Sequence, residues 1–378
     1  MPAYCYFIAV TWSKGAISQH LQALGRHLVA QGHKVIYLSD GKQKIRIDEG
    51  NLQVYSFPTS RPTSPVDFIF LQQLTRQYLP DCMIINFGAE NVMNIIGLVN
   101  GVPNRINWYH TPLSAILIDS QNTRWKNRLL VARKWLIYQL AVTGFIANSE
   151  LSRLDLIAQY GIDTAKITVF PNSIADIAPS LIDDIVRDPR LIICPGRLAG
   201  VKGQDILIRA LGLLHQGGIM PHVIFVGGAD KRNNKLEELK ALAVQLGVQE
   251  QCQFVGEVSH SEMFKYFASA GFSIVPSRSE AFGLVNIESM SVRTPVIASA
   301  VGGIPEIIRD GVDGFLVPPE DPQALAEKIK LLYNDPVLRE QLGYNARERF
   351  LDVFEGSKNI ERQALWFEEV VRKTHKTK

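Results

Sequence analysis

The sequence predicts an α/β protein with two doubly wound domains, each built around a parallel sheet. The first observation behind this prediction is length, because 378 residues exceed the size at which one hydrophobic core keeps growing. The second is that short apolar runs alternate with helical patterns along the chain, which is typical of parallel sheets covered by helices on both faces. The third is composition, since 46% apolar and 20% charged residues are typical of globular proteins.

The first domain is expected over residues 1–175. Its opening run, Tyr4-Cys-Tyr-Phe-Ile-Ala-Val10, has no basic segment before it and no small-residue cleavage site after it. We therefore interpret it as a strand and not as a signal segment. A helix over about residues 18–30 follows and is stopped by Gln31-Gly32. The further strands predicted in this half span residues 34–38, 81–86, 105–108, 144–147 and 167–170.

A polar, proline-containing stretch from Pro171 to about Arg190 is the candidate linker. The second domain is expected over residues 190–350, where the same rhythm resumes. Asp321-Pro322 predicts an N-cap and a helix start, and residues 355–378 predict a C-terminal helix that packs back on the first domain. The strands predicted in this half span residues 191–194, 222–226, 251–254, 272–275 and 295–298.

Charge and cysteine usage limit the class of partner. The chain has 40 basic and 37 acidic residues, and the basic excess forms one short patch, so nucleic acid is not an expected partner. The cysteines have no Cys-x-x-Cys spacing, which is typical of reduced core residues, and we expect a cytoplasmic protein. They are Cys5, Cys82, Cys194 and Cys252.

The basic patch lies in residues 124–136, where cations alternate with apolar side chains. Two interpretations stay open. In the first, the segment is an amphipathic helix that lies on an anionic surface and makes a peripheral contact with the inner face of the cytoplasmic membrane. Alternatively, it is a surface helix over a buried apolar stripe, which is the simpler interpretation because five cations are few for an anchor. The cations are Arg124, Lys126, Arg128, Arg133 and Lys134, and the apolar residues are Trp125, Leu129, Leu130, Trp135 and Leu136.

Two carboxylates mark the second domain. Glu280 and Glu288 follow the apolar run at residues 272–276, so Glu280 is predicted on the turn after a buried strand and Glu288 one to two turns into the next helix. Ligands of open α/β folds bind at the carboxyl ends of strands, and Phe282-Gly283 can add backbone N–H donors there. Two acids beside an anion site indicate a nucleotide sugar. The alternative is a helix-capping acid followed by a solvated helix position.

The second domain opens with two cations, Arg197 and Lys202, in Cys194-Pro-Gly-Arg-Leu-Ala-Gly-Val-Lys-Gly203. Such a strand-to-helix turn can place a guanidinium, an ammonium and a helix N-terminus on one diphosphate. An ordinary basic turn is the alternative, and the motif alone does not decide between them. Neither domain carries a complete Gly-x-Gly-x-x-Gly or a P-loop, which argues against a dehydrogenase or a P-loop enzyme.

Together these motifs resemble the retaining GT-B glycosyltransferases of family four. The resemblance rests on Gly-Arg-x-x-x-x-Lys-Gly, the Glu280/Glu288 motif, Ser299-Ala-Val-Gly-Gly-Ile-Pro-Glu-Ile-Ile308 and Gly311-Val-Asp-Gly-Phe-Leu-Val-Pro318. It covers nearly the whole chain, although those enzymes usually carry two adjacent glycines where this chain has Ser13-Lys14-Gly15. It implies the GT-B fold, in which two Rossmann-like doubly wound domains face each other across a cleft.

The resemblance also implies roles for individual residues. Arg197 and Lys202 would hold the donor diphosphate and stabilise its charge as the glycosidic bond breaks. Glu288 would accept the ribose hydroxyls, and Glu280 would contact hydroxyls of the donor sugar. The remaining donor-binding positions are backbone contacts at Gly15, Val255, Phe282, Gly283 and Leu284.

His110 follows the predicted strand at residues 105–108, which places it at the carboxyl edge of the N-terminal sheet. A lone histidine is more often structural than catalytic. In the resembling family, a histidine after this strand touches the donor sugar near the reacting carbon. The resemblance therefore implies a catalytic role for His110.

The function that follows is retaining transfer of a hexose from a UDP-sugar, with UDP-glucose as the preferred donor. The expected acceptor is a lipid-linked or polysaccharide hydroxyl in envelope or exopolysaccharide biosynthesis. No Asp-x-Asp occurs and no His/Cys cluster has metal spacing, so we expect neither a metal nor another cofactor. Two rivals stay open. A nucleotide-sugar 2-epimerase would need several acids or bases around C2, and a non-catalytic nucleotide-sugar-binding subunit would need only the binding residues.

Overall fold

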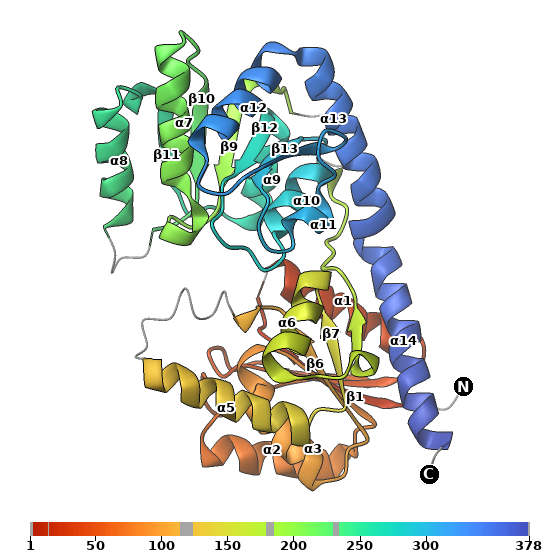
Figure 1. Ribbon diagram of the computed structural model, residues 1–378. Coiled ribbons are helices and arrows are strands. Elements are labelled where there is room, and N and C mark those ends of the chain that lie inside the picture. Colours follow the sequence, from red (N-terminus) through yellow and green to blue (C-terminus); the bar gives the residue numbers. More distant parts are fainter. Residues whose placement is uncertain (1–2, 14, 114–123, 179–184, 230–233, 377–378) are drawn as a thin grey trace. The chain divides into compact units, whose positions relative to one another are not determined.

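The chain divides into two compact units, each with its own sheet (Figure 1). The computed structural model describes residues 3–13, 15–113, 124–178, 185–229 and 234–376. Unit 1 comprises Met1–Ser173 and Gly356–Lys378, and unit 2 comprises Ile174–Glu355. Unit 2 is therefore inserted in the sequence of unit 1.

Unit 1 contains an eight-stranded sheet in the order β3-β4-β2-β1-β5-β6-β7-β8. All neighbouring strands pair in parallel except β3 with β4, which are antiparallel. The strands are β1 (Cys5–Val10), β2 (Lys34–Ser39), β3 (Arg46–Glu49), β4 (Leu52–Ser56), β5 (Cys82–Ile85), β6 (Asn104–Tyr109), β7 (Gly144–Ala147) and β8 (Ile167–Val169).

Helices cover both faces of this sheet (Figure 1). The core on one face contains apolar side chains of α1 and α14, and the core on the other contains those of α2 and α3. Tyr138 of α5 and Leu156 of α6 belong to a third cluster, against β7. The helices are α1 (Ala16–Ala30), α2 (Pro65–Tyr78), α3 (Glu90–Val99), α5 (Arg124–Leu140), α6 (Glu150–Tyr160) and α14 (Gly356–Lys376), with 3-10 turns at Phe87–Ala89 and Thr164–Lys166.

The C-terminal helix α14 is an integral part of the unit 1 core. Its buried Ala364, Phe367 and Val371 join the same cluster as the apolar face of α1. The Gln363 amide oxygen also lies 2.7 Å from Nε2 of the buried His20 on α1. The first and last helices of the unit therefore depend on each other for burial.

Unit 2 contains a six-stranded, all-parallel sheet in the order β11-β10-β9-β12-β13-β14. One core cluster joins this sheet to α7, α8, α12 and α13. The strands are β9 (Asp188–Pro195), β10 (His222–Val226), β11 (Cys252–Gly256), β12 (Ala270–Val275), β13 (Val296–Ser299) and β14 (Gly314–Val317). The helices are α7 (Gln204–Gln216), α8 (Lys235–Gln245), α9 (His260–Ser269), α10 (Leu284–Ser291), α11 (Ile304–Ile307), α12 (Pro322–Asn334) and α13 (Pro336–Arg349), with short turns η4 (Gly200–Lys202), η5 (Gln249–Gln251) and η6 (Phe350–Phe354).

The expected fold class is confirmed, since both units are Rossmann-like α/β sheets. The sequence prediction omitted β3, β4 and β14, and the antiparallel β3 departs from the expected parallel arrangement. β3 carries only Ile47 as an apolar residue and turns back at Gly50, whose φ is +68°. A four-residue polar edge strand has no apolar run from which it could be recognised. Within the described residues, no helix is long and apolar enough to cross a membrane.

Candidate active site

Lys202 and Glu280 form an ion pair at the carboxyl edge of the unit 2 sheet. Lys202 is the last residue of η4, and Glu280 lies on the turn after β12. The Lys202 Nζ atom lies 2.5 Å from a carboxylate oxygen of Glu280. The two side chains are 26% and 15% exposed, so a ligand can reach the pair from solvent. Residues of two separate motifs are thus brought into one site.

Glycines allow the two turns that carry this pair to pass close to neighbouring backbone. A Cβ atom on Gly203, whose φ is +66°, would lie 1.9 Å from the Pro276 carbonyl oxygen. One on Gly302, whose φ is +59°, would lie 1.5 Å from the Glu280 carbonyl oxygen. No other residue tolerates both this backbone conformation and this contact. Two motif glycines therefore fix the positions of Lys202 and Glu280.

Arg197 lies on the exposed turn that follows β9. The turn begins at Gly196, whose φ is +126°, and the amide of the buried Gln204 donates to the Arg197 carbonyl oxygen at 3.0 Å. Its backbone is thus held by Gln204, and the residue is exposed. An exposed arginine on such a turn suits recognition of an anion, and its role at the donor diphosphate stays a prediction.

Glu288 is buried on α10 and is hydrogen-bonded to a histidine that the sequence analysis missed. Glu288 is 6% exposed, and its Oε1 atom lies 3.0 Å from Nε2 of His260. The hydrogen bond to Glu288 raises the pKa of His260 above its ordinary value, against the opposing effect of burial. His260 opens α9 directly after β11, so a search for polar residues behind each strand would have found it.

The start of α10 supplies the predicted backbone donors. Gly283 is its N-cap with φ +100°, Phe282 before it is buried, and Leu284 is the first helical residue. The first N–H groups of a helix have no acceptor within the helix, so they are available to a ligand. Val255 lies near the end of β11, at the same sheet edge. Whether these groups contact a donor stays a prediction.

One motif residue has a structural role. Asp313, in the Gly311–Pro318 segment, is fully buried. Its carboxylate accepts hydrogen bonds from the Arg309 backbone N–H at 2.7 Å and from the Arg309 guanidinium at 2.5 Å. This part of the family motif therefore stabilises the turn before β14.

In unit 1, His110 follows β6 and lies within an aromatic stack. Its ring centroid lies 4.8 Å from that of Phe87 and 5.8 Å from that of Trp108, and both of these rings are stacked nearly parallel to it. Its Nε2 atom lies 2.8 Å from Oδ1 of Asn86, and the Asn86 amide donates to the Ala9 carbonyl oxygen. The orienting residues Asn86 and Phe87 follow β5, the neighbour of β6, but the sequence analysis did not single them out.

These contacts fix the chemical state of His110. Burial, together with the nearby His20, lowers the pKa of His110 to about 3, so the ring is neutral at physiological pH. Because Asn86 presents an oxygen, Nε2 carries the proton and Nδ1 carries the lone pair. Nδ1 is buried without a hydrogen-bond partner among the described residues. His110 can therefore accept a hydrogen bond, but it is a weak base and cannot supply positive charge.

Gly15 is the N-cap of α1 with an ordinary φ of −69°. A Cβ atom there would meet only Ser13 Oγ at 3.6 Å, so the conformation does not require glycine. No neighbouring backbone lies close to Gly15, so its predicted role as a point of close approach would apply only to a bound ligand. Lys14 lies outside the described residues.

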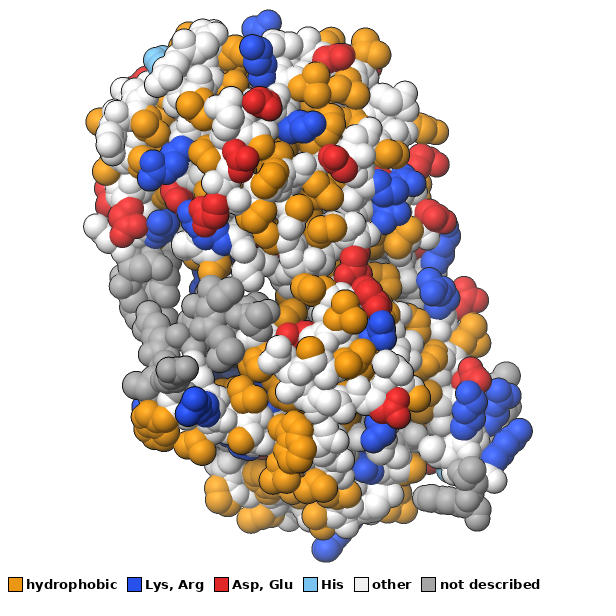
Figure 2. All heavy atoms as spheres, viewed as in Figure 1, with side chains coloured by type: hydrophobic (Ala, Val, Ile, Leu, Met, Phe, Trp, Pro, Cys, Tyr) orange, Lys and Arg blue, Asp and Glu red, His pale blue; other side chains and the backbone are white. Residues whose placement is uncertain are grey.

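The basic helix α5 presents its apolar side chains to solvent. Trp125, Leu129, Trp135 and Leu136 are between 48% and 60% exposed, so the interpretation of these residues as a buried stripe is wrong. The buried side of α5 is instead held by Tyr138 and Lys134, which contact Glu90. Lys126, Arg128 and Arg133 are exposed. Figure 2 shows hydrophobic side chains gathered where α5, α2 and α3 lie.

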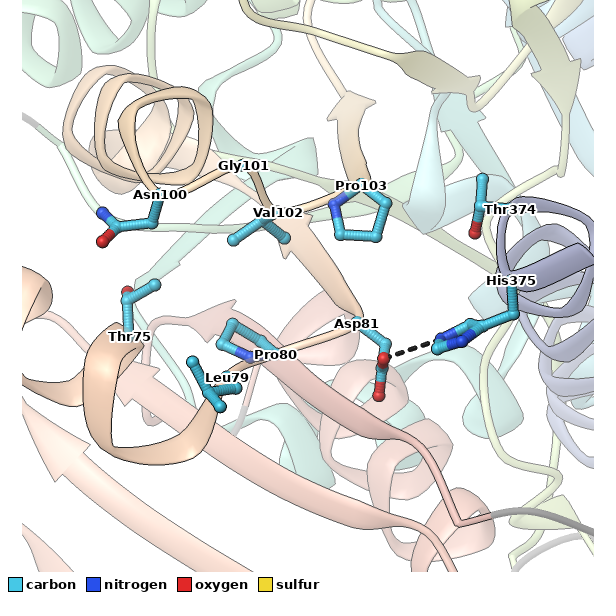
Figure 3. A pocket seen from close by; sticks show the side chains of 10 residues that line it. All are labelled: Thr75, Leu79, Pro80, Asp81, Asn100, Gly101, Val102, Pro103, Thr374 and His375. Atoms are coloured by element: carbon cyan, nitrogen blue, oxygen red, sulfur yellow. Dashed lines mark hydrogen bonds and ion pairs between the residues drawn. The ribbon is translucent and has the colours of Figure 1, made fainter. Parts of the chain in front are cut away.

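A pocket of about 230 Å³ lies at the opposite, amino edge of the unit 1 sheet (Figure 3). No residue of the predicted site lines it. Asp81, just before β5, and His375 of α14 face each other across it at 2.8 Å. We interpret this contact as an attachment of the end of α14 to the sheet.

Two family models match the chain. Glycosyltransferase Family 4 matches residues 17–176, and Glycosyl transferases group 1 matches residues 182–349. D-inositol 3-phosphate glycosyltransferase 1 of Catenulispora acidiphila is 35% identical over 209 residues, or 52% of this chain and 50% of the relative. The D-inositol 3-phosphate glycosyltransferase of Acidothermus cellulolyticus is 33% identical over 244 residues, or 60% and 54%. The chain spans about half the length of these relatives.

Solved structures resemble the chain over nearly its whole length. Sucrose-phosphate synthase from Thermosynechococcus elongatus superposes with a TM-score of 0.78 at 20% identity, covering 99% of this chain and 100% of that one. HepE from Anabaena in complex with UDP superposes with a TM-score of 0.76 at 20% identity, covering 97% and 100%. At this identity the similarity concerns the fold, which is GT-B. The two family models, which together match most of the chain, show that it belongs to the group 1 glycosyltransferases of family 4.

Proposed function

We propose that this chain is a retaining glycosyltransferase that moves a hexose from a UDP-sugar to an acceptor hydroxyl. The observation that carries the proposal is the Lys202–Glu280 pair at the carboxyl edge of the unit 2 sheet, with Arg197 on the same segment between β9 and α7 as Lys202. It combines cations for a diphosphate with a carboxylate for sugar hydroxyls. The D-inositol 3-phosphate glycosyltransferases and the UDP-bound HepE support this choice of chemistry.

The chemistry assigns a separate task to each group. Arg197 and Lys202 stabilise the negative charge that develops on the departing diphosphate. An ammonium has three N–H donors, so Lys202 can contact Glu280 and phosphate together. Glu280 binds hydroxyls of the sugar, Glu288 binds the ribose diol, and the transition state is oxocarbenium-like. The two cations neutralise the leaving group without a metal, and we expect transfer to persist in excess EDTA.

UDP-glucose is the proposed donor, which is supported by the structure of HepE with UDP-glucose. The proposed acceptor is a lipid-linked or polysaccharide hydroxyl of envelope assembly. His110, with a pKa of about 3, is a poor base for proton abstraction at C2, which argues against an epimerase. The proposed role of His110 is to accept a hydrogen bond from a sugar hydroxyl.

We also propose that α5 holds unit 1 at an anionic membrane surface. Trp125, Leu129, Leu136 and Leu140 are spaced four, seven and four residues apart and are 51–63% exposed, so they form one apolar stripe. The exposed cations Lys126, Arg128 and Arg133 lie on the same helix. An exposed apolar stripe flanked by cations is typical of interfacial helices.

A panel of nucleotide sugars tests the catalytic proposal. We expect slow release of UDP from one UDP-sugar without acceptor, faster release with acceptor, and retention of both rates in EDTA.

Losing one charge-assisted contact costs about 1.5–3 kcal/mol, so Arg197→Ala and Lys202→Ala should weaken UDP binding about ten- to a hundredfold by calorimetry. Arg209→Ala, on the exposed face of α7, is the control. A 2-epimerised donor would identify an epimerase, and binding without turnover would identify a binding subunit.

A further inference from the structure

A pocket of about 500 Å³ lies in unit 2 at the amino edge of the sheet. Pro189 and Gly271 line it near the starts of β9 and β12. A Cβ atom on Gly271 would lie 2.3 Å from the Pro189 carbonyl oxygen, so glycine is needed for the two strands to meet here. Because the strands of this sheet are parallel, Lys202 and Glu280 lie at the opposite edge. The pocket is therefore separate from the candidate donor site, and its volume is typical of small-molecule sites.

The lining of this pocket is strongly basic. It contains Arg187, Arg293 and Arg339, whereas Glu340 is the one acid among the described residues that line it. Three positive charges and one negative charge leave a net charge of +2. None of the three arginines forms an ion pair with a carboxylate in the part of the chain that the structure describes. The three cations therefore repel one another, and a bound anion would relieve this repulsion.

Arg187 binds the carboxyl end of α10. Its guanidinium donates to the Val292 carbonyl oxygen at 2.8 Å and to the Arg293 carbonyl oxygen at 2.9 Å. These contacts satisfy carbonyl groups at a helix end, which is a structural role. They use two of the five N–H donors of a guanidinium, so the other three can serve a ligand.

Arg293 has a backbone conformation that favours glycine. Its φ is +61°, and it follows Val292, the C-cap of α10, at a position where glycine is the usual residue. An arginine there is strained, and because it is exposed, burial in a core does not explain the strain. A cation at a helix C-terminus is favourable, but Arg187 already supplies one. An anionic ligand of the Arg293 guanidinium would account for the choice of arginine.

The third arginine is buried on α13. Arg339 is 8% exposed, and its guanidinium donates to the Leu332 carbonyl oxygen. A buried guanidinium without a carboxylate partner is costly. Gly343 lets α13 pack closely on the turn after α10, since a Cβ atom there would lie 2.5 Å from the Arg293 carbonyl oxygen. This packing holds Arg339 and Tyr344 at the pocket, so the pocket is formed before any ligand arrives.

We propose that this pocket binds the phosphate monoester of a small molecule. Such a group carries a charge of about −1.5 to −2 at pH 7, which matches the net charge of +2 on the lining. Its three terminal oxygens suit several guanidinium groups at once. The volume also leaves room for an organic part, to which Tyr344, 54% exposed, offers an aromatic face or a hydroxyl. The proposal does not depend on glycosyl transfer.

Methyl phosphate and methyl sulfate are probes of the same shape that differ in charge. At pH 8 methyl phosphate is a dianion and methyl sulfate is a monoanion. Calorimetry at fixed ionic strength, with excess UDP to fill the donor site, should show saturable binding of methyl phosphate at least tenfold tighter than that of methyl sulfate. The double variant Arg197→Ala with Lys202→Ala, which lacks the donor-site cations, should bind methyl phosphate as the parent does. Equal affinities for the two probes, or no binding of methyl phosphate in either experiment, would overturn the proposal.

Variants assign the binding to the pocket. Arg293→Gly removes a guanidinium and also relieves the backbone strain, so it should raise the melting temperature and weaken methyl phosphate binding at least tenfold. Arg339→Lys keeps the charge but loses the planar fork, so it should retain part of the affinity. Arg209→Ala, which removes an exposed arginine of α7 outside the pocket, should leave the affinity for methyl phosphate unchanged. Parent affinity for methyl phosphate in Arg293→Gly would contradict the assignment. Affinity for UDP, measured on the same variants, reports separately on the donor site and should stay at the parent value.

Discussion

Glu280 and Glu288 belong to one sequence motif but have different partners, and this difference separates their expected roles. Glu280 pairs with the proposed phosphate-binding Lys202, whereas Glu288 is buried and bound to His260.

Glu288→Ala should lower the affinity for UDP about tenfold, because the ribose diol loses its hydrogen-bond acceptor. Glu280→Ala should leave UDP affinity equal or slightly higher, because Lys202 is released, but should reduce discrimination between UDP-glucose and UDP-galactose. Calorimetry with the three ligands measures both effects. Equal losses of UDP affinity would contradict the division.

His260 predicts a pH dependence of donor binding. Its pKa is raised above the ordinary value by the hydrogen bond to Glu288, so the charged form is favoured at low pH and is lost as pH rises through the raised pKa. The positive charge of the imidazolium offsets the negative charge of the Glu288 carboxylate, which would otherwise repel an anionic ligand. Affinity for UDP-glucose, which has no phosphate ionisation in this range, should therefore fall several-fold between about pH 6 and 9.

A variant isolates this effect. His260→Gln retains a donor toward Glu288 but does not titrate, so its affinity should be nearly independent of pH. A slope equal to that of the parent in His260→Gln would assign the pH dependence to another group. The affinity of His260→Gln at high pH should match that of the parent, since both then present a neutral donor.

Sequence motifs identified the residues of the candidate site that lie on turns, but not the residues that orient them. Glu280 on a turn and Glu288 in a helix are where the apolar pattern placed them. His260 and Asn86 act through hydrogen bonds to residues 28 and 24 positions away. Such contacts depend on which strands become neighbours, and this information is absent from periodicity. The order of strands would have predicted that Asn86 and His110 meet, since both follow adjacent strands.

At the scale of elements, most apolar strands were predictable, and β3, β4 and β14 were not. β1, β10 and β12 are short apolar runs, each followed along the chain by a helix, and the sequence predicted all three. β14 is only four residues long and begins at Gly314, where a Cβ atom would meet the Val296 carbonyl oxygen at 2.5 Å. Glycine lowers strand propensity, and here it is needed because the backbone of β13 is close.

Helix α5 shows why a pattern does not specify which face is buried. Apolar residues occupy both sides of it, with Tyr138 packed inside and Trp125 59% exposed. The inner side is selected by contacts with Glu90 of α3. The pattern alone therefore could not choose between a core helix and an interfacial helix.

The exposed face of α5 predicts binding to anionic vesicles. Each cation near an anionic surface contributes about 1 kcal/mol, so attachment should be weak, reversible and sensitive to salt. Co-sedimentation with phosphatidylglycerol vesicles should exceed that with phosphatidylcholine. Replacing Lys126, Arg128 and Arg133 by Ser should abolish the difference, and Trp125→Ser with Leu129→Ser should weaken binding to both.

A matched control removes three exposed cations of unit 2, Arg209, Lys265 and Lys330. This variant has the same net charge as the triple α5 variant, so it tests location against total charge. Similar losses in the two triple variants would show that α5 has no special part in lipid binding.

At the scale of the whole molecule, the insertion of unit 2 into unit 1 predicts unequal results from truncation. Residues 174–355 contain a complete sheet and the core cluster that joins it to four helices, so this fragment should unfold cooperatively by itself. Residues 1–173 lack the buried Ala364, Phe367 and Val371. Burial of either of the two larger side chains, Phe367 or Val371, contributes about 1.5–3 kcal/mol to stability. The fragment should bind a hydrophobic dye and aggregate. Adding a peptide of residues 356–376 should restore cooperative thermal unfolding, and a folded, dye-free fragment 1–173 would contradict this account.

The position of α14 in the unit 1 core also bears on how the protein is made. The ribosome completes β1 to β8 early, but the segment that covers Leu21, Leu24 and Leu28 emerges only after all of unit 2. At ordinary elongation rates this interval is roughly 10–40 s. During that time the nascent chain carries an uncovered apolar face, while unit 2 has everything it needs to fold. Chaperone capture during synthesis should therefore concentrate on unit 1, because its strands are synthesised first and its last helix is synthesised after unit 2.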